Sequence, residues 1–114
     1  MPKTFQELLT QTRAMIAGFA KIEQRPWGVE GSMLELAKQV GDLAKRVMVV
    51  EKYYLKSREI NPQYQASTKE VADELFDIWF CLVRIADHYS IDFETTIDEI
   101  TQKEIRDLKS KRIT

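Results

Sequence analysis

The stretch STKEVADELFDIWFCLVRIADHY, residues 67–89, decides the fold of this chain. It contains neither Gly nor Pro and is too long for an ordinary strand, so it predicts one helix. With Glu74 at the zero of a helical wheel, apolar side chains cover an arc of roughly 220°. A surface helix needs only about half of that arc, so this helix must be covered on most sides, by its own domain or by another copy of the chain. Its narrow polar stripe carries Glu70, Asp73, Glu74, Asp77, Cys81, Arg84 and His88.

Three further segments repeat apolar residues at the three- and four-residue steps of a helix. They run from about 4 to 22, from about 32 to 55, and from about 92 onward. Capping boxes are expected at Thr4 and Ser32, at the start of two of these segments, and at Ser67, at the start of the helix of residues 67–89. The chain has 114 residues with only 4 Gly and 3 Pro, which favours long helices in one domain over a many-stranded sheet. We therefore expect residues 1–114 to form a single all-α domain, a four-helix bundle completed by homo-oligomerisation.

Composition excludes several classes of protein. The chain has 17 Lys and Arg against 18 Asp and Glu, and this balance argues against a dedicated nucleic-acid binder. No apolar run approaches the roughly 18 residues that span a bilayer, so no membrane partner is expected. Cys81 is the one cysteine and cannot form an internal disulfide. Since no secretory signal opens the sequence, we expect a reducing, cytoplasmic setting.

Two predicted helices carry acidic stripes that can face each other. Glu74 and Asp77 are three residues apart and can reach one cation from the same helix face. Glu35, Gln39 and Asp42 are aligned at i, i+4 and i+7 on the preceding helix. One interpretation is that both stripes are solvated faces, with Glu35 serving the cap. The other, favoured because the helix of residues 67–89 leaves little room for a solvent face, is a groove that binds a hard cation such as Mg²⁺.

These two helices resemble the MazG-like, all-α nucleoside triphosphate pyrophosphohydrolase superfamily over about residues 27–106. That family has Glu-x-x-Glu on one helix and Glu-x-x-Asp on the next, together holding Mg²⁺. The second motif is intact as Glu74-Leu75-Phe76-Asp77. The first corresponds to KQVGDLA at 38–44, where Gln39 and Asp42 stand in the places of the two glutamates. Gln39 removes one negative charge, and Glu35, one turn earlier, can supply it.

The resemblance implies a hydrolase that cleaves a (deoxy)nucleoside triphosphate between its α- and β-phosphates, giving the monophosphate and pyrophosphate, in a house-cleaning role toward non-standard nucleotides. It also implies Mg²⁺, with Mn²⁺ as a possible substitute, held by Asp42, Glu74 and Asp77. Glu35 and Gln39 are then the catalytic residues that complete the ligand set or orient the attacking water. The family assembles as dimers or tetramers, so a homodimer or homotetramer is expected.

The expected substrate contacts are Trp27, Lys38, Arg46 and Lys103. Trp27, in a loop, can stack on the base, and its alternative is a loop anchor packed on the bundle. Lys38 and Arg46 can offset the triphosphate charge, and their alternative is a solvated side chain. Lys103 matches one position of the family's C-terminal helix, whereas Glu104 and Asp107 stand where an Asn and an Arg are usual.

Two other functions fit the same sequence. The first is a relative that has lost turnover, a nucleotide-binding or regulatory oligomeric module, which the Gln39 replacement favours. The second is a purely structural helical oligomer, which requires the acidic stripes to be ordinary solvent faces. Base preference, sugar preference and the choice between dimer and tetramer do not follow from the sequence.

Overall fold

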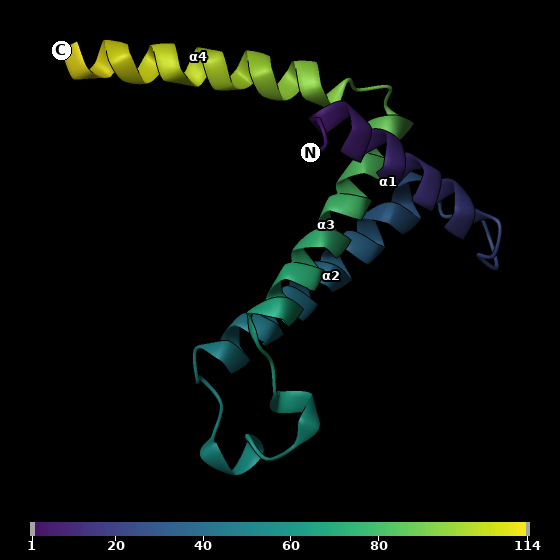
Figure 1. The fold of residues 1–114 in the computed structure, drawn as a ribbon, viewed down its shortest axis with the longest axis vertical. Helices are drawn as coiled ribbons and strands as arrows, with labels where there is room; N and C mark the ends of the chain where they lie inside the picture. The colour runs from purple at the N-terminus through teal and green to yellow at the C-terminus, as the bar shows by residue number, and fades with distance from the viewer. Residues whose placement is uncertain (1, 114) are drawn as a thin grey trace.

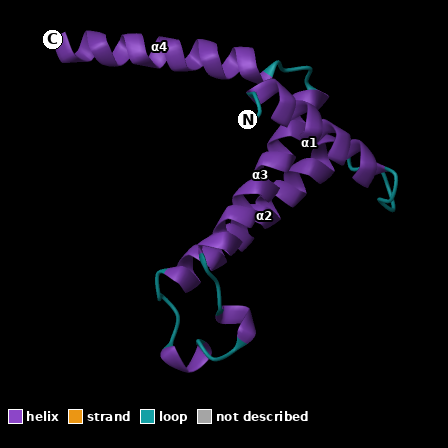
Figure 2. Cartoon of the chain, viewed as in Figure 1, coloured by secondary structure: helices purple, strands orange, loops and turns teal. Residues whose placement is uncertain are grey.

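The computed structural model describes residues 2–113, with side chains described as far as Lys111. Within this range the chain forms four α-helices and no strand, as expected (Figures 1 and 2). The helices are α1 (Phe5–Ala20), α2 (Gly28–Val50), α3 (Thr68–His88) and α4 (Phe93–Ile113). Two short 3₁₀ turns, η1 (Lys56–Arg58) and η2 (Pro62–Tyr64), lie in the long connection between α2 and α3.

Two of the three predicted capping boxes are confirmed. Thr4 accepts from the backbone N–H of Glu7, and the Glu7 carboxylate accepts from the backbone N–H of Thr4. Ser67 and Glu70 repeat the arrangement at the start of α3. The Ser67 hydroxyl and backbone N–H both bind the Glu70 carboxylate, and they lower the pKa of Glu70 to about 2. Each box satisfies backbone donors that a helix start leaves free.

The third predicted capping box, at Ser32, is wrong. Helix α2 begins four residues earlier, at Gly28, so Ser32 lies buried inside it and its hydroxyl donates to the Gly28 carbonyl at 2.9 Å. Gly28 has a φ of +61°, a conformation that a side chain would disfavour. At Gly31 a Cβ would lie 2.8 Å from the Cβ of Trp27, so this glycine permits the close packing of Trp27. Both glycines precede residue 32, where the sequence pattern placed the start of this helix, but they belong to its first turn.

Helices α2 and α3 end in the same way. After α3, the N–H of Ile91 donates to the Ala86 carbonyl at 2.8 Å and the N–H of Ser90 donates to Asp87 at 3.1 Å. Ser90 has a φ of 55°. This pattern is a Schellman motif, with serine where glycine is usual. Lys52, with a φ of 64°, occupies the equivalent position after α2.

Helices α1, α2 and α3 pack together, with most of the contacts between α2 and α3 and the next most between α1 and α3. Leu9 of α1 and Val83 of α3 are fully buried in this unit. Trp79 joins three helices, because its indole N–H donates to the Thr12 hydroxyl at 3.0 Å and its ring stacks on Phe93, at the start of α4, at 5.7 Å. Burial of such apolar and aromatic surface is the main stabilising contribution to the unit.

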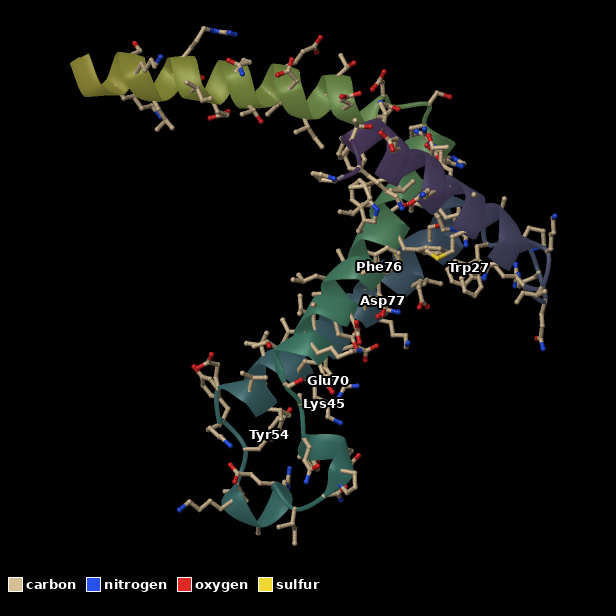
Figure 3. The ribbon with its side chains drawn as sticks, viewed as in Figure 1. Trp27, Lys45, Tyr54, Glu70, Phe76 and Asp77 are labelled. Atoms are coloured by element: carbon tan, nitrogen blue, oxygen red, sulfur yellow. The ribbon has the colours of Figure 1, made fainter. Side chains whose placement is uncertain are left out.

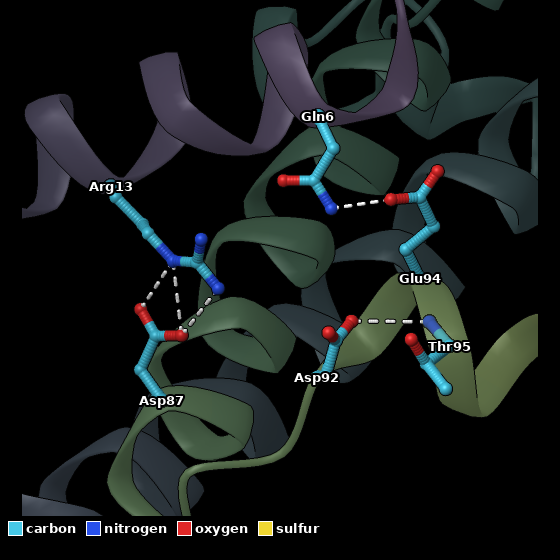
Figure 4. A network of polar contacts seen from close by, with 6 residues as sticks. All are labelled: Gln6, Arg13, Asp87, Asp92, Glu94 and Thr95. Atoms are coloured by element: carbon cyan, nitrogen blue, oxygen red, sulfur yellow. Dashed lines mark hydrogen bonds and ion pairs between the residues drawn. The ribbon is translucent and has the colours of Figure 1, made fainter.

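Helix α4 projects away from the other three instead of joining them (Figure 1). The radius of gyration is 18.3 Å, whereas a compact chain of this length has about 13 Å. Polar contacts are found at the base of α4: Gln6 of α1 donates to Glu94, and Asp92 accepts from the N–H of Thr95 (Figure 4). The four predicted helices are therefore present, but one chain packs only three of them together.

None of the described helices combines the length and the apolar content needed to cross a bilayer.

Candidate functional site

The two acidic stripes face each other across α2 and α3 and form a polar groove. Arg46 of α2 lies 3.6 Å from Glu74 of α3, measured from Nε to Oε1. Lys38 pairs with Asp42 at 3.4 Å and reaches Glu35 at 3.9 Å. We use the name polar groove for Glu35, Gln39, Asp42 and Arg46 of α2 together with Glu74 and Asp77 of α3.

Two oxygen atoms in the polar groove are buried without a hydrogen-bond donor among the described residues. They are Oε2 of Glu74 and Oε1 of Gln39. The Glu74 side chain is only 12% exposed, and the other half of the Gln39 amide donates to Glu35 at 2.8 Å. A buried acceptor without a donor is destabilising and calls for a partner such as water or a cation. These oxygens are the types of ligand that hard cations prefer.

The charges of the polar groove shift the pKa values of Asp77 and of the neighbouring Lys38. Burial raises the pKa of Asp77, and the charges of Asp73, Glu35 and Asp42 act in the same direction while Lys38 opposes them. The pKa of Lys38 is raised, chiefly by its hydrogen bond to Asp42 and then by the charge of Glu35. Burial and the neighbouring carboxylates both disfavour the charged form of Asp77, and a bound cation would offset both effects.

The predicted metal ligands do not form one cluster in this structure. Within residues 2–113, no three His, Cys, Asp or Glu side chains are grouped closely enough to hold a metal ion. Glu74 is paired with Arg46, and Asp42 is paired with Lys38. The donor set fits a hard divalent cation in its chemistry and in its two unsatisfied oxygens, while the ligand set of Asp42, Glu74 and Asp77 stays a prediction.

A cavity of about 450 Å³ opens from the polar groove toward α1, and we call it the aromatic cavity. This volume is within the range of small-molecule sites. Figure 3 shows Asp77 midway along the α2–α3 hairpin and Trp27 nearer to α1. The apolar lining is Met15, Phe19, Ile22, Trp27, Phe76 and Phe80. The remaining lining residues are Glu23, Glu35, Gln39, Asp77 and Cys81.

A second cavity of about 210 Å³, the distal cavity, lies at the other end of the polar groove. Asp42 and Glu74 line it together with Lys45, Arg46 and Gln63. Gln63 comes from the long α2–α3 connection. The groove thus leads from an aromatic chamber to a chamber with two basic side chains, an arrangement that can bind a molecule with one flat apolar part and one anionic part.

Trp27 has properties of both of its predicted roles. It precedes the first residue of α2, and the Arg84 guanidinium lies over its ring at 4.3 Å from the ring centroid. That contact anchors the loop, as the alternative interpretation proposed. The indole also lines the aromatic cavity, so it can contact a ligand there.

Lys103 is the predicted site residue that this structure leaves apart from the others. It lies on the projecting helix α4, where it pairs with Asp107 at 3.0 Å and is well exposed. The family resemblance that suggested Lys103 carried no information on the direction of α4 in this chain. Within one chain, Lys103 therefore does not contribute to the polar groove.

Sequence reasoning missed Glu23 as a site residue. Its side chain is 11% exposed, lines the aromatic cavity and is paired with Arg84 at 2.9 Å. It lies just beyond α1 with no motif around it, so only the packing of α1 against α3 identifies it. Cys81 is fully buried, and burial raises the pKa of its thiol, which fits a packing role and disfavours a thiolate.

Comparison of the chain with protein-family models, with curated proteins and with solved structures finds no match.

Proposed function

We propose that this chain is a Mg²⁺-dependent nucleoside triphosphate pyrophosphohydrolase. Water adds to the α-phosphorus, the bond from that phosphorus to the α,β-bridging oxygen breaks, and the products are a nucleoside monophosphate and pyrophosphate. The observation that carries the proposal is an aromatic cavity that opens onto Glu35, Gln39 and Asp77. The groove beyond it holds two buried oxygens without a donor, one on the Gln39 amide and one on the Glu74 carboxylate. The motif resemblance supports the same reaction class.

In this proposal the base and sugar enter the aromatic cavity beside Trp27. The triphosphate lies along the polar groove toward the distal cavity. Lys38, beside Asp42, and Arg46, which lines the distal cavity, offset its charge. Asp42, Glu74 and Asp77 hold the metal ion, which supplies charge neutralisation at the phosphates and a more acidic water. Glu35 orients the attacking water, and Gln39, which donates to Glu35 at 2.8 Å, fixes the position of that carboxylate.

Homo-oligomerisation is part of the proposal, as a dimer or a tetramer. Large apolar side chains on α4 are uncovered, including Ile100, which is 56% exposed, and so are Leu8 of α1 and Phe76 of α3. Apolar area of this extent usually marks an interface. A second copy would also be the route by which Lys103 reaches a groove. We expect light scattering to give a multiple of the monomer mass for the wild type, and the monomer mass for Ile100→Glu.

Pyrophosphate release from a panel of (d)NTPs tests the catalytic proposal. We expect release that requires Mg²⁺ or Mn²⁺ and falls by more than about 100-fold in Glu74→Ala, beyond the 10–100-fold cost of losing a residue that only supports a metal ligand. Glu99→Ala, an exposed change on α4, is the matched control and should retain wild-type release. Metal-independent release, or equal release by Glu74→Ala, would contradict the proposal.

A second candidate function is a nucleotide-binding module without turnover. Gln39 in place of a carboxylate and the Arg46–Glu74 pair favour it, because both reduce the negative charge available to a metal ion. Its signature is Mg²⁺-dependent nucleotide binding with no pyrophosphate release. Neither binding nor release would leave a structural oligomer, for which the polar groove is an ordinary solvated face.

A further inference from the structure

Glu23 lies at the end of the aromatic cavity away from the distal cavity. It follows α1, and its backbone N–H still donates to the Phe19 carbonyl at 3.1 Å. Its partner Arg84 lies seven residues beyond Asp77 on α3, about two helical turns. The cavity therefore has a carboxylate at each of two separated places: Asp77 on the polar groove side, and Glu23 among aromatic side chains.

Arg84 holds the Glu23 carboxylate in one orientation. The two guanidinium nitrogens Nη1 and Nη2 donate to Oε2 at 2.9 Å and to Oε1 at 3.3 Å, a two-pronged pair. Both side chains are 11% exposed. The guanidinium also contacts two aromatic rings, at 4.3 Å from the centroid of Trp27 and 5.7 Å from that of Phe80. Such a buried, two-pronged pair is geometrically specific.

The ion pair with Arg84 leaves Glu23 able to accept hydrogen bonds from a ligand. A carboxylate has about four lone-pair sites, and Arg84 uses two. The two lone pairs that accept from Arg84 face the guanidinium. The other two, one on each carboxylate oxygen, point away from each other, so a single ligand group can reach only one of them. A carboxylate paired with a guanidinium offers acceptors only. A ligand group that fits must therefore protrude and must carry a hydrogen-bond donor.

We propose that Glu23 is a base-selecting residue and that the aromatic cavity prefers nucleobases with an amino group at C4 of a pyrimidine or at C6 of a purine. The N4 amine of cytosine and the N6 amine of adenine protrude and donate. Uracil, thymine and hypoxanthine present a carbonyl oxygen at the same position, which faces the carboxylate without a hydrogen. The ring N–H of uracil is recessed between two carbonyl oxygens. This inference rests on the proposed function, since it takes the ligand to be a nucleotide.

Matched nucleotide pairs test the inference without any variant. CTP and UTP differ at position 4, and ATP and ITP differ at position 6, in each case by an amine against a carbonyl. We expect the amino member of each pair to have a kcat/KM at least about 10-fold higher, carried by KM, as for one hydrogen bond to a charged group. The α,β-methylene analogues of the same four nucleotides, titrated calorimetrically with Mg²⁺, give the ratio of Kd values independently of turnover.

Glu23→Gln assigns the preference to this residue. The amide keeps the side-chain length and one acceptor for Arg84 but adds a donor, so the preference should fall to about 3-fold or less, with UTP improving. Glu30→Gln is the matched control, because Glu30 is exposed, changes the charge equally and lines a different cavity. It should keep the wild-type preference. Thermal unfolding of each variant checks that it is folded at the assay temperature.

The outcomes separate the two proposals. Amino preference that is lost in Glu23→Gln supports the inference. Selective binding without release supports it while overturning the hydrolase. Release without preference for the amino members, or a preference that Glu23→Gln leaves intact, overturns the inference and leaves the hydrolase standing. Absence of binding for all four analogues overturns both.

Discussion

Helices α3 and α4 have the same length, 21 residues, but α3 packs against other helices whereas α4 is largely exposed. Helix α3 buries Cys81, Val83 and Ala86 against α1 and α2. Helix α4, which projects from the other helices (Figure 1), leaves Ile97, Ile100, Ile105 and Leu108 exposed. An apolar stripe at helical spacing therefore predicts a helix but does not say what covers it. Since isolated helices are marginal in water, this exposed stripe is one reason for the oligomer proposed above.

The largest expected difference is between the stability changes caused by a mutation in the buried core and by one on the exposed face of α4. Leu9→Ala should lower the free energy of unfolding by about 2–5 kcal/mol, because Leu9 is 1% exposed and its loss leaves a cavity. Leu108→Ala, at a residue that is 55% exposed, should change it by about 0.5 kcal/mol or less in the monomer. Urea denaturation at low protein concentration measures both. Equal losses would contradict the difference between the two regions.

The next expected effect is a pH dependence of stability and of Mg²⁺ affinity, caused by the buried carboxylate of Asp77 on α3. Folding raises the pKa of Asp77, so the metal-free protein loses stability as the pH rises through that raised value. Metal binding needs the carboxylate, so Mg²⁺ affinity should change in the opposite direction and fall by up to about 10-fold per pH unit below the folded-state pKa.

Asp77→Asn should therefore stabilise the metal-free protein at neutral pH and remove this pH dependence of Mg²⁺ binding. Calorimetric titration of Mg²⁺ and urea denaturation, each repeated across pH, measure the two effects. Asp98→Asn on the exposed face of α4 is the control and should change neither. Mg²⁺ binding by Asp77→Asn with the wild-type pH profile would remove Asp77 from the ligand set.

A smaller effect is expected at the start of α3. Ser67→Ala should cost about 1 kcal/mol, as for other N-caps. The pKa of Glu70 is lowered from 4.5 to about 2, so its stabilising contribution is complete above pH 4.5 and is lost as the pH falls toward 2. The variant should lose part of this acid sensitivity, which denaturation between those pH values detects. Thr101→Ala, exposed on α4, serves as the control, and an unchanged acid profile in Ser67→Ala would contradict the assignment.

The smallest effect lies at the junction between α3 and α4. Ser90 has a φ of 55°, which glycine adopts without strain. Ser90→Gly should raise the free energy of unfolding by up to about 1 kcal/mol, reduced by the greater freedom of glycine in the unfolded chain. Ser90→Val should lower it, because a branched side chain disfavours this conformation. Destabilisation by Ser90→Gly would show that the serine side chain itself stabilises the junction.

Much of the fold could be predicted from local sequence patterns. The apolar spacing of residues 67–89 and the capping residues Thr4 and Ser67 act over one or two helical turns, and those predictions are confirmed. Ser32 misled the prediction because its sequence context is equally good for a cap, whereas Gly28 and Trp27 set the actual start of α2. Gly31 lies within this start and leaves room for the Trp27 side chain.

The candidate site also has a part that the sequence predicts and a part that only the structure shows. Glu35, Gln39, Asp42, Glu74 and Asp77 were predicted to face one groove, because helical spacing alone aligns them, and they line the two cavities between α2 and α3. Their basic partners were not predicted as such. The Arg46–Glu74 pair depends on the register of one helix against the other, and that register is set by side-chain packing over the whole hairpin.

By itself the sequence determined that the chain is helical, where three of the helices begin, and which side chains share a helix face, since these depend on contacts within a few residues. Only the tertiary structure decided that α4 projects, that Lys103 lies apart from the groove, and that Glu23 meets Arg84 across 61 residues. Packing between distant segments decides such pairings, because many arrangements satisfy the local preferences equally and only the burial of complementary surfaces distinguishes them.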